Sequence, residues 1–174
     1  LTESGYSDSN AKWVLGGKAM IWNSDRAGYR SHGSWGSEDD TYIMFFDVDA
    51  YNRFLMNKED IALLEEAEKA EKAEKEKAKK EKAEKKEDTK DSKKKTNQNE
   101  NAKKDSTEVK PLTFDLENRF DRIVRLTVNS SRLGDAVMSP KGDILYYLAA
   151  FEGDYDLWEH KLKENTTKIL LKGV

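Results

Sequence analysis

The chain has 174 residues, of which 37% are charged and 36% hydrophobic, with ten glycines, no cysteine and a formal net charge of −3. Without cysteine it can form no disulfide framework, thiolate metal site or cysteine nucleophile, and its two histidines are too few for a multi-histidine metal centre. The longest wholly apolar run, 144–151, is far shorter than the roughly 20 residues of a membrane helix. We therefore predict no metal, no cofactor and no membrane span.

The first region, 1–56, is rich in aromatic residues and glycine. Short apolar runs at 19–22 and 41–46 predict β-strands, and Gly16 and Gly17 predict a tight turn before the first of them. The chain begins at Leu1 without a methionine or a signal-like stretch, and its first two residues resemble the end of a strand. We therefore expect a segment of a longer protein.

The middle region, 57–109, is an insertion rich in lysine and glutamate. Of the 40 residues from 65 to 104, 27 are charged: fifteen lysines and twelve acidic residues. A helix is predicted to start within 55–64 and to continue to Glu87, because glutamate and lysine recur four residues apart and stabilise an exposed helix. The composition of 88–107 predicts disorder. Apolar heptad positions are missing, which argues against a coiled coil.

The third region, 110–174, predicts an all-β structure. Its apolar runs are separated by turn-forming sequences at intervals of about ten residues, the pattern of hairpins and meanders. The predicted strands are 122–128, 135–138, 144–148, 156–162 and 168–171.

An internal repeat connects the two outer regions. At an offset of 125, Gly17 aligns with Gly142, and Met20-Ile21-Trp22 aligns with Leu145-Tyr146-Tyr147. Further along, at an offset of 116, Asp40-Thr41-Tyr42 aligns with Asp156-Leu157-Trp158, so the first copy has nine additional residues in its loop. The order of strand, turn and strand is the same in both copies, which is the signature of a repeat architecture.

The repeat predicts an all-β fold of two (partial) four-stranded antiparallel β-propeller blades with a long charged α-helical and disordered insertion. The second copy holds four strand-like runs in about 45 residues, the length of one propeller blade. The predicted domains are a blade at 1–56, the insertion at 57–109 and a blade at 110–174. The insertion is placed between the outer strand of the first blade and the inner strand of the next, where a long connection adds little closure cost.

The motifs resemble those of a known family. Ser139-Pro140-Lys141-Gly142 followed by Tyr155-Asp156-Leu157-Trp158 resembles the propeller repeats of tricorn-type and TolB-like proteins. The loop from Trp22 to Gly36 and the stretch 125–131, together with the Lys/Glu-rich insertion, resemble the second propeller of tricorn-like serine peptidases of the tail-specific protease type from Bacteroidetes-like bacteria. The first copy departs from the motif at 14–18, where Gly17 alone is kept.

The resemblance implies a non-catalytic segment that gates or docks peptide substrates for a serine catalytic core outside this sequence. No catalytic residue is carried over, so the segment itself is expected to be inactive while its parent is a PDZ-containing hydrolase. Implied partners are peptide substrates, the remaining blades, the catalytic core and a homo-oligomer of the parent. A periplasmic location is favoured over the cytoplasm by resemblance only. The alternatives are a TolB-like propeller that binds protein partners without enzymatic activity, and a charged helix that acts as a spacer or interaction arm.

The candidate contact site is the long loop of the first copy. His32 lies near serine and acidic residues, but a catalytic triad is defined by geometry, and neighbours within one loop rarely satisfy it. We expect a loop that contacts peptide or a neighbouring domain, or that packs on the adjacent blade. The candidate contact residues are Tyr29, Arg30, His32 and Trp35.

Other residues of the repeat are expected to be structural. Glu38-Asp39-Asp40 lacks the ligand spacing of an EF-hand, so a turn or hydrogen-bonding role is expected for Asp40 rather than calcium binding. The expected structural positions are Gly17, Asp40, Tyr42, Pro140, Gly142, Asp156 and Trp158. Trp13, Trp22, Trp158, Tyr42 and Tyr147 are expected in the core between the sheets, and His160 is expected in a solvated position on an outer strand.

The basic insertion is expected to be a solvated spacer that binds no nucleic acid. Its densest cluster, Lys93-Lys94-Lys95, lies among acidic residues, and the insertion contains no aromatic residue for base stacking.

Overall fold

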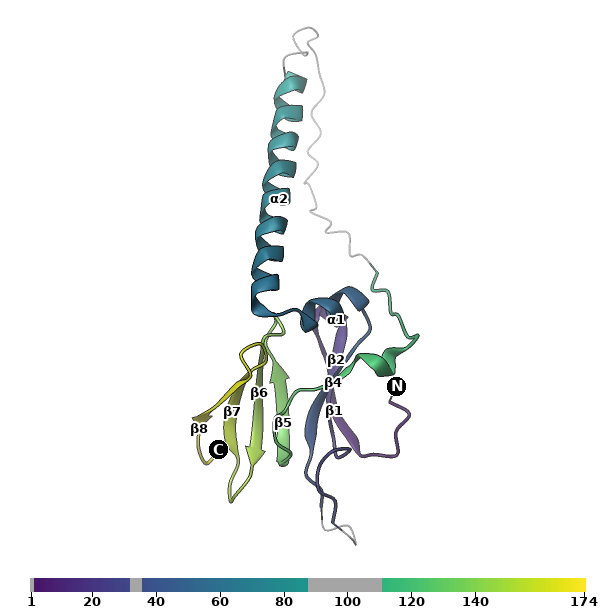
Figure 1. Cartoon of the computed structure of the whole chain (residues 1–174), viewed down its shortest axis with the longest axis vertical. Coiled ribbons are helices and arrows are strands. Elements are labelled where there is room, and N and C mark those ends of the chain that lie inside the picture. The colour runs from purple at the N-terminus through teal and green to yellow at the C-terminus, as the bar shows by residue number, and fades with distance from the viewer. Residues whose placement is uncertain (1, 32–35, 88–110) are drawn as a thin grey trace, which may run out of the picture. The chain divides into compact units, whose positions relative to one another are not determined.

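The computed structural model describes residues 2–31, 36–87 and 111–174 (Figure 1). The chain divides into two compact units, one with Leu1–Met56 and Leu112–Val174 and the other with Asn57–Pro111. Within the described residues, the first unit contains two four-stranded antiparallel sheets. The second contains a long helix.

The first sheet pairs its strands in chain order. The strands are β1 (Asp8–Val14), β2 (Ala19–Ser24), β3 (Asp40–Phe45) and β4 (Ile123–Arg125). A short 3₁₀ turn, η1 (Leu15–Gly17), joins β1 to β2, and another, η2 (Arg119–Arg122), leads into β4. Every residue of β3 is buried because both of its faces are covered.

The second sheet repeats this plan without an insertion. Its strands are β5 (Arg132–Met138), β6 (Ile144–Ala150), β7 (Asp156–Lys161) and β8 (Thr166–Leu171). Alternate residues of β5 and β6 are buried, as expected for strands that have one covered face.

The strand register is the same in the two sheets. Trp22 lies opposite Tyr42 in the first sheet, and Tyr147 lies opposite Trp158 at the equivalent position of the second. Both pairs stack, with ring centroids 5.8 and 6.4 Å apart. The repeat found in the sequence is therefore a repeat of cross-strand pairs.

The turn between the first two strands of each sheet is also equivalent. Gly17 and Gly142 align in the sequence, and both have positive φ angles, +88° and +74°. Glycine adopts this left-handed conformation without the steric cost of a Cβ. The motif residue Pro140 lies between β5 and β6, in the turn that Gly142 completes.

The sheets pack on each other through opposite faces, so that the contact is head to tail. We call the face carrying Met20 and Leu145 the rear face of its sheet, and the other the front face. The front face of the first sheet packs on the rear face of the second in one apolar core. From the first sheet this core takes Ala19, Ile21, Ile43 and Phe45; from the second it takes Leu133, Ala136, Met138, Leu145, Tyr147 and Ala149, with Trp158 partly buried.

Polar contacts join the inner strands across this interface. Lys12 donates to the Asp135 carboxylate at 2.5 and 2.6 Å, and Asn10 donates to the Gly134 carbonyl at 3.1 Å. At the turn end, a Cβ on Gly142 would lie 2.7 Å from a terminal methyl group of Leu15, which would have to move. The two sheets therefore form one packed body.

The insertion lies within the first sheet and not between the two sheets, which corrects the sequence analysis. β4 follows the insertion in the chain but pairs with β3, so residues 112–125 belong to the first sheet. The chain segments on either side of the insertion meet where Asp115 N donates to Phe46 O at 2.8 Å. Arg122 fastens the chain that follows the insertion to the first sheet, because its side chain donates to the carbonyls of Phe45 and Asp115 at 3.1 and 2.7 Å. Once the two ends of a loop are held together, extra residues in the loop add little to the entropy cost of closing it.

A short helix that the sequence analysis did not predict, α1 (Val48–Leu55), precedes the insertion. Asp47 caps it by accepting a hydrogen bond from Ala50 N at 2.7 Å. Phe54 packs on Phe45 with ring centroids 5.0 Å apart. Lys163, from the β7–β8 turn, donates to the carbonyls of Phe54 and Met56. Its positive charge lies at the C-terminus of α1, where the helix dipole favours a cation.

The charged helix α2 (Lys58–Glu87) is helical over the predicted range up to Glu87, the last described residue of this stretch. Asn57 caps its start, where the side-chain Oδ1 accepts from Asp60 N at 2.8 Å. No helix in the described ranges is both long and apolar enough to cross a membrane. The expected disorder of 88–107 and the Lys93-Lys94-Lys95 cluster lie outside the described residues.

Two expectations about the core are wrong in detail. Trp13 is 55% exposed, because it lies on an edge strand, where its ring contacts Phe46 and Phe114. Trp22 and Tyr42 are buried, but on the rear face of the first sheet, away from the second sheet. Tyr147 and Trp158 do lie between the sheets.

The expectation for His160 is also wrong. β7 is an internal strand, and His160 is buried with Nδ1 2.7 Å from Thr167 Oγ1. It occupies the repeat position of Met44, which is buried in the first sheet.

Candidate functional site

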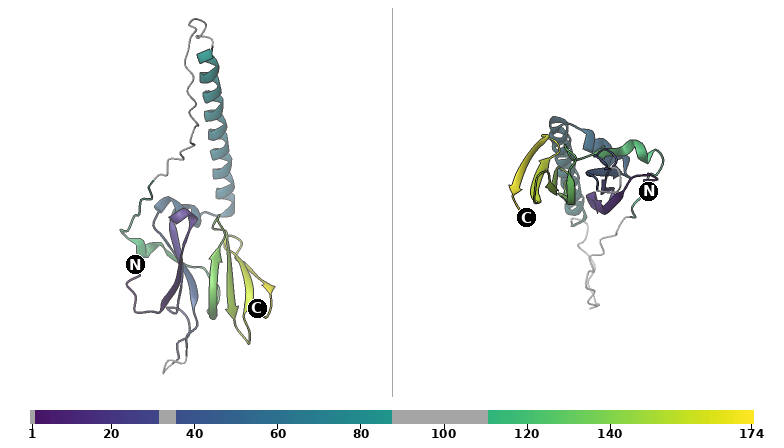
Figure 2. Two further views of the ribbon diagram at one scale, coloured as in Figure 1. Left: turned by 180° about the vertical axis from the view of Figure 1, so that it is seen from behind. Right: turned by 90° about the horizontal axis from the view of Figure 1, so that it is seen from below.

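The loop between β2 and β3 extends from the end of the sheets opposite to α1 (Figures 1 and 2). It forms an irregular hairpin, in which Glu38 N donates to Tyr29 O at 2.9 Å and Arg30 pairs with Ser37. Gly28 packs directly against this pairing, because a Cβ there would lie 1.8 Å from the Glu38 carbonyl oxygen. The backbone therefore holds the base of the loop in one conformation.

Arg26 anchors the base of the loop to the rear face of the first sheet. Its guanidinium lies 4.9 Å from the Tyr42 ring centroid and 5.4 Å from that of Trp22, within cation–π range. It also forms an ion pair with Asp8 at 3.1 Å, with both side chains more than four-fifths buried. The loop is thus attached through a charge that is paired and packed on aromatic rings.

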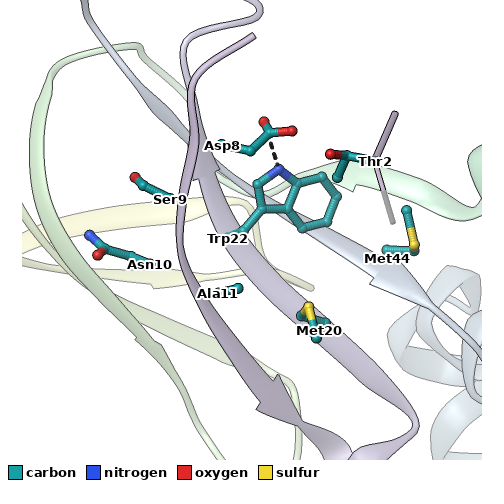
Figure 3. A pocket seen from close by; sticks show the side chains of 8 residues that line it. All are labelled: Thr2, Asp8, Ser9, Asn10, Ala11, Met20, Trp22 and Met44. Atoms are coloured by element: carbon teal, nitrogen blue, oxygen red, sulfur yellow. Dashed lines mark hydrogen bonds between the residues drawn. The ribbon is translucent and has the colours of Figure 1, made fainter. Parts of the chain in front are cut away.

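Asp8 is the acceptor at the centre of this anchor. Burial alone would raise its pKa, but hydrogen bonds from Ser24, Ser4, Thr2 and Arg26 outweigh burial and hold the pKa well below its usual value. Trp22 Nε1 donates to the same carboxylate at 3.2 Å (Figure 3). Asp8 therefore remains ionised and cannot serve as a proton donor near neutral pH.

The structure describes two of the four candidate contact residues. Tyr29 is 70% exposed, so its ring is presented to solvent from the loop. The Arg30 guanidinium lies 4.7 Å from the centroid of the Tyr6 ring, within cation–π range. His32 and Trp35 lie outside the described residues, as does the Ser-His-Asp interpretation that depends on His32.

Asp40 lies at the junction between the loop and the sheet. Its side chain is fully buried and accepts hydrogen bonds from Thr127 Oγ1 at 2.6 Å and Ser130 Oγ at 2.8 Å, with an ion pair to Arg125 at 2.7 Å. Asp156, at the same repeat position, accepts from Gly173 N at 3.0 Å. Each aspartate ties the start of its third strand to the chain that leaves its fourth strand.

The acidic residues beside Asp40 do not form a metal centre. Burial raises the pKa of Asp39, and the nearby carboxylates of Asp25 and Asp40 raise it further, against the lowering effect of a hydrogen bond from Ser37. Within the part of the chain that the structure describes, no group of three or more acidic or histidine side chains could hold a metal ion.

A pocket of about 350 Å³ opens on the rear face of the first sheet (Figure 3). Trp22, Met20 and Met44 form its apolar wall, and Thr2 and Asp8 contribute polar atoms. In the second sheet the equivalents of Met20, Trp22 and Met44 are Leu145, Tyr147 and His160. All three are buried, and Leu145 and Tyr147 belong to the core shared with the first sheet. The pocket therefore lies at the position that, in the second sheet, packs against the first sheet.

Sequence reasoning missed the Arg26–Asp8 anchor. The two residues are 18 positions apart and meet only because β1 and β2 are antiparallel. Neither belongs to the repeat pattern, so no sequence signal pointed to them.

Comparison of the sequence with protein-family models and with curated proteins gives no match.

Proposed function

We propose that this chain is a non-catalytic segment of a β-propeller that gates or docks peptides for a tricorn-like serine peptidase. The observation that carries the proposal is the head-to-tail packing of two sheets with the same strand register. A head-to-tail contact can be repeated from one sheet to the next, as propeller blades require. The family assignment rests on the resemblance in the repeat, the loop and the insertion.

The β2–β3 loop is the proposed docking element. Tyr29 offers an exposed aromatic ring, and Arg30 offers a positive charge held against Tyr6. An extended peptide presents carbonyl groups and carboxylates that suit an arginine, and side chains that suit an aromatic surface. The rigid base formed by Arg26 and Asp8 limits the entropy lost on binding.

Peptide binding by the isolated chain tests the docking role. We expect a panel of fluorescein-labelled peptides to include members that raise fluorescence anisotropy, and we expect Y29A and R30A each to weaken that binding by about fivefold or more. The matched control is K141A, an exposed cation in the turn at the other end of the sheets. If no peptide binds, or if K141A weakens binding as much as R30A, the docking role is wrong.

Hydrolysis and gene sequence separate the family alternatives. The isolated chain is expected to leave fluorogenic peptides intact, and turnover blocked by a serine-directed inhibitor would contradict the proposal. The reading frame that encodes the chain is expected to encode PDZ and serine-protease domains after these blades. Peptide or protein binding by a product without those domains would favour the TolB-like binding module.

A further inference from the structure

The rear face of the first sheet is open along β1, whereas the rear face of the second sheet is covered along the equivalent strand β5. Trp13 is 55% exposed, and its repeat equivalent Met138 is 7% exposed. Ala11 is exposed, and its equivalent Ala136 is 4% exposed. The two residues of β5 are buried because they belong to the core shared with the first sheet. The pocket beside Met20 lies on the open side of β1 (Figure 3).

The same leucine contact is present at the turn of each sheet, but its origin differs. In the second sheet, Leu15 of the neighbouring first sheet lies over Gly142, where a Cβ would be 2.7 Å from a leucine methyl group. In the first sheet, Leu112 lies over the equivalent Gly17, and the corresponding distance is 2.6 Å. Leu112 follows the insertion in the chain. The chain itself therefore fills, on the first sheet, the position that a neighbouring sheet fills on the second.

Side-chain contacts alone hold this substitute in place. Phe114 packs on Trp13 with ring centroids 5.7 Å apart, and we call Leu112 and Phe114 together the cap. The two cap residues are 52% and 48% exposed. Within the described part of the chain, no backbone hydrogen bond holds them, and the next residue, Asp115, is fastened to the sheet by its bond to Phe46 O. The cap can therefore leave the sheet while Asp115 remains attached.

We propose that the cap occupies a docking surface for a further sheet of this repeat, so that the cap and a neighbouring sheet compete for the rear face of the first sheet. The existence of that neighbour rests on the proposed propeller, whereas the competition goes beyond it. Docking of the neighbour releases the chain that follows the insertion from the turn at Gly17. Without the neighbour, the cap covers the apolar turn end of the sheet.

The repeat also indicates the chemistry of the partner. The front face of the first sheet, which packs on the second sheet, presents Ile43 and Phe45 from its third strand. The front face of the second sheet has Glu159 and Lys161 at these positions. A second copy that docked through this face would bury both charged side chains against apolar residues, which costs free energy. The favoured partner is therefore a sheet with an apolar third strand, and not a second copy of this chain.

A fluorescent label at residue 114 reports whether the cap is in place. The chain has no cysteine, so F114C can carry a single bimane group, whose fluorescence tryptophan quenches on contact. We expect Trp13 to quench this label, and W13F defines the unquenched signal. L112D should abolish the quenching, because a carboxylate is unfavourable in the apolar contact over Gly17. The matched control is L116D, at a 48% exposed leucine beyond Asp115, which should leave the quenching unchanged.

The deciding measurement uses the labelled chain extended by the residues that its reading frame encodes before Leu1, about 45 of them, the length of one sheet. The extended chain should lose the quenching as fully as L112D does. If the added residues fold as a sheet by circular dichroism and the label stays quenched, the competition is wrong and the propeller stands. If they form no sheet, both proposals are wrong. Loss of quenching in the unextended chain as its concentration rises would make a second copy the partner and overturn the proposal.

Discussion

At the scale of single residues, the repeat shows which side chains the fold requires and which it only tolerates. Met44 and His160 occupy the same position, yet one is apolar and the other titratable. His160 is 4% exposed, so the fold buries an imidazole where a thioether suffices. Burial lowers the pKa of His160, against a smaller opposing effect from the Thr166 backbone. This residue therefore links stability to pH.

The repeat suggests H160M as the substitution that removes this linkage. Because the folded pKa of His160 lies below the unfolded value of about 6.5, the unfolded chain binds more protons between the two values. The stability that the protein gains by burying neutral His160 is fully present above that pH window and is lost as the pH falls through it. We expect urea unfolding to show the wild type losing stability relative to H160M between pH 7.5 and 5. Subtracting the two curves cancels the effects of His32 and Asp39, and parallel curves would contradict the prediction.

At the scale of elements, the β1–β2 and β5–β6 turns fix how the strands enter each sheet. Gly142 combines two constraints, a left-handed φ and a Cβ position already filled by Leu15. Gly16 has the first constraint, with φ of +64°, and not the second, since a Cβ there would meet open space. Substitutions at Gly142 and Gly16 therefore separate the effect of backbone strain from that of steric overlap.

We predict that G142A destabilises the protein more than G16A does. Left-handed alanine costs about 1 kcal/mol at either position, and overlap with Leu15 adds roughly 1 kcal/mol or more at Gly142. The measurement is the free energy of unfolding in urea. In an L15A background the two glycine substitutions should cost nearly the same. An unchanged difference in that background would show that the overlap with Leu15 is not responsible.

The insertion is a second element whose cost can be measured. The chain segments on either side of the insertion meet at Phe46 and Asp115, and residues 112–125 fold with the first sheet. Replacing residues 58–110 with a Gly-Ser linker of about 12 residues should keep the near-ultraviolet circular dichroism and change stability by about 1 kcal/mol or less, because closure entropy depends weakly on loop length. Loss of cooperative unfolding would mean that the insertion supports the sheets.

The sequence predicted those parts of the fold that depend on local pattern. Alternation, the turn glycine and the repeat offset placed most strands, and charge spacing indicated the long helix, which the structure describes as Lys58–Glu87. It misplaced the insertion, because a three-residue strand such as β4 carries no local signal of its partner. Asp8 and Arg26, like buried His160, depend on neighbours that strand pairing brings together. The amphipathic pattern and Asp47 cap of α1 were present in the sequence but lay within a region assigned to the blade.

At the scale of the whole molecule, the two sheets share one apolar core, so their stabilities are coupled. Ile43 lies on the front face of the first sheet with no exposed surface and belongs to the same cluster as Leu145 and Tyr147 of the second. Repeat proteins derive stability from such interfaces between neighbouring units. Loss of packing in one sheet should therefore weaken the other.

We predict that I43A lowers the free energy of unfolding by about 3 kcal/mol, since it removes buried methyl groups and leaves a cavity. Native-state hydrogen exchange distinguishes coupled from separate unfolding. If the sheets unfold together, the most protected amides of β6 and β7 lose as much protection as those of β2 and β3. V137A, on the exposed front face of the second sheet, should change stability by about 0.5 kcal/mol or less. Loss of protection confined to the first sheet would mean that each sheet is an independent folding unit, and the shared core would then be a contact between two stable bodies.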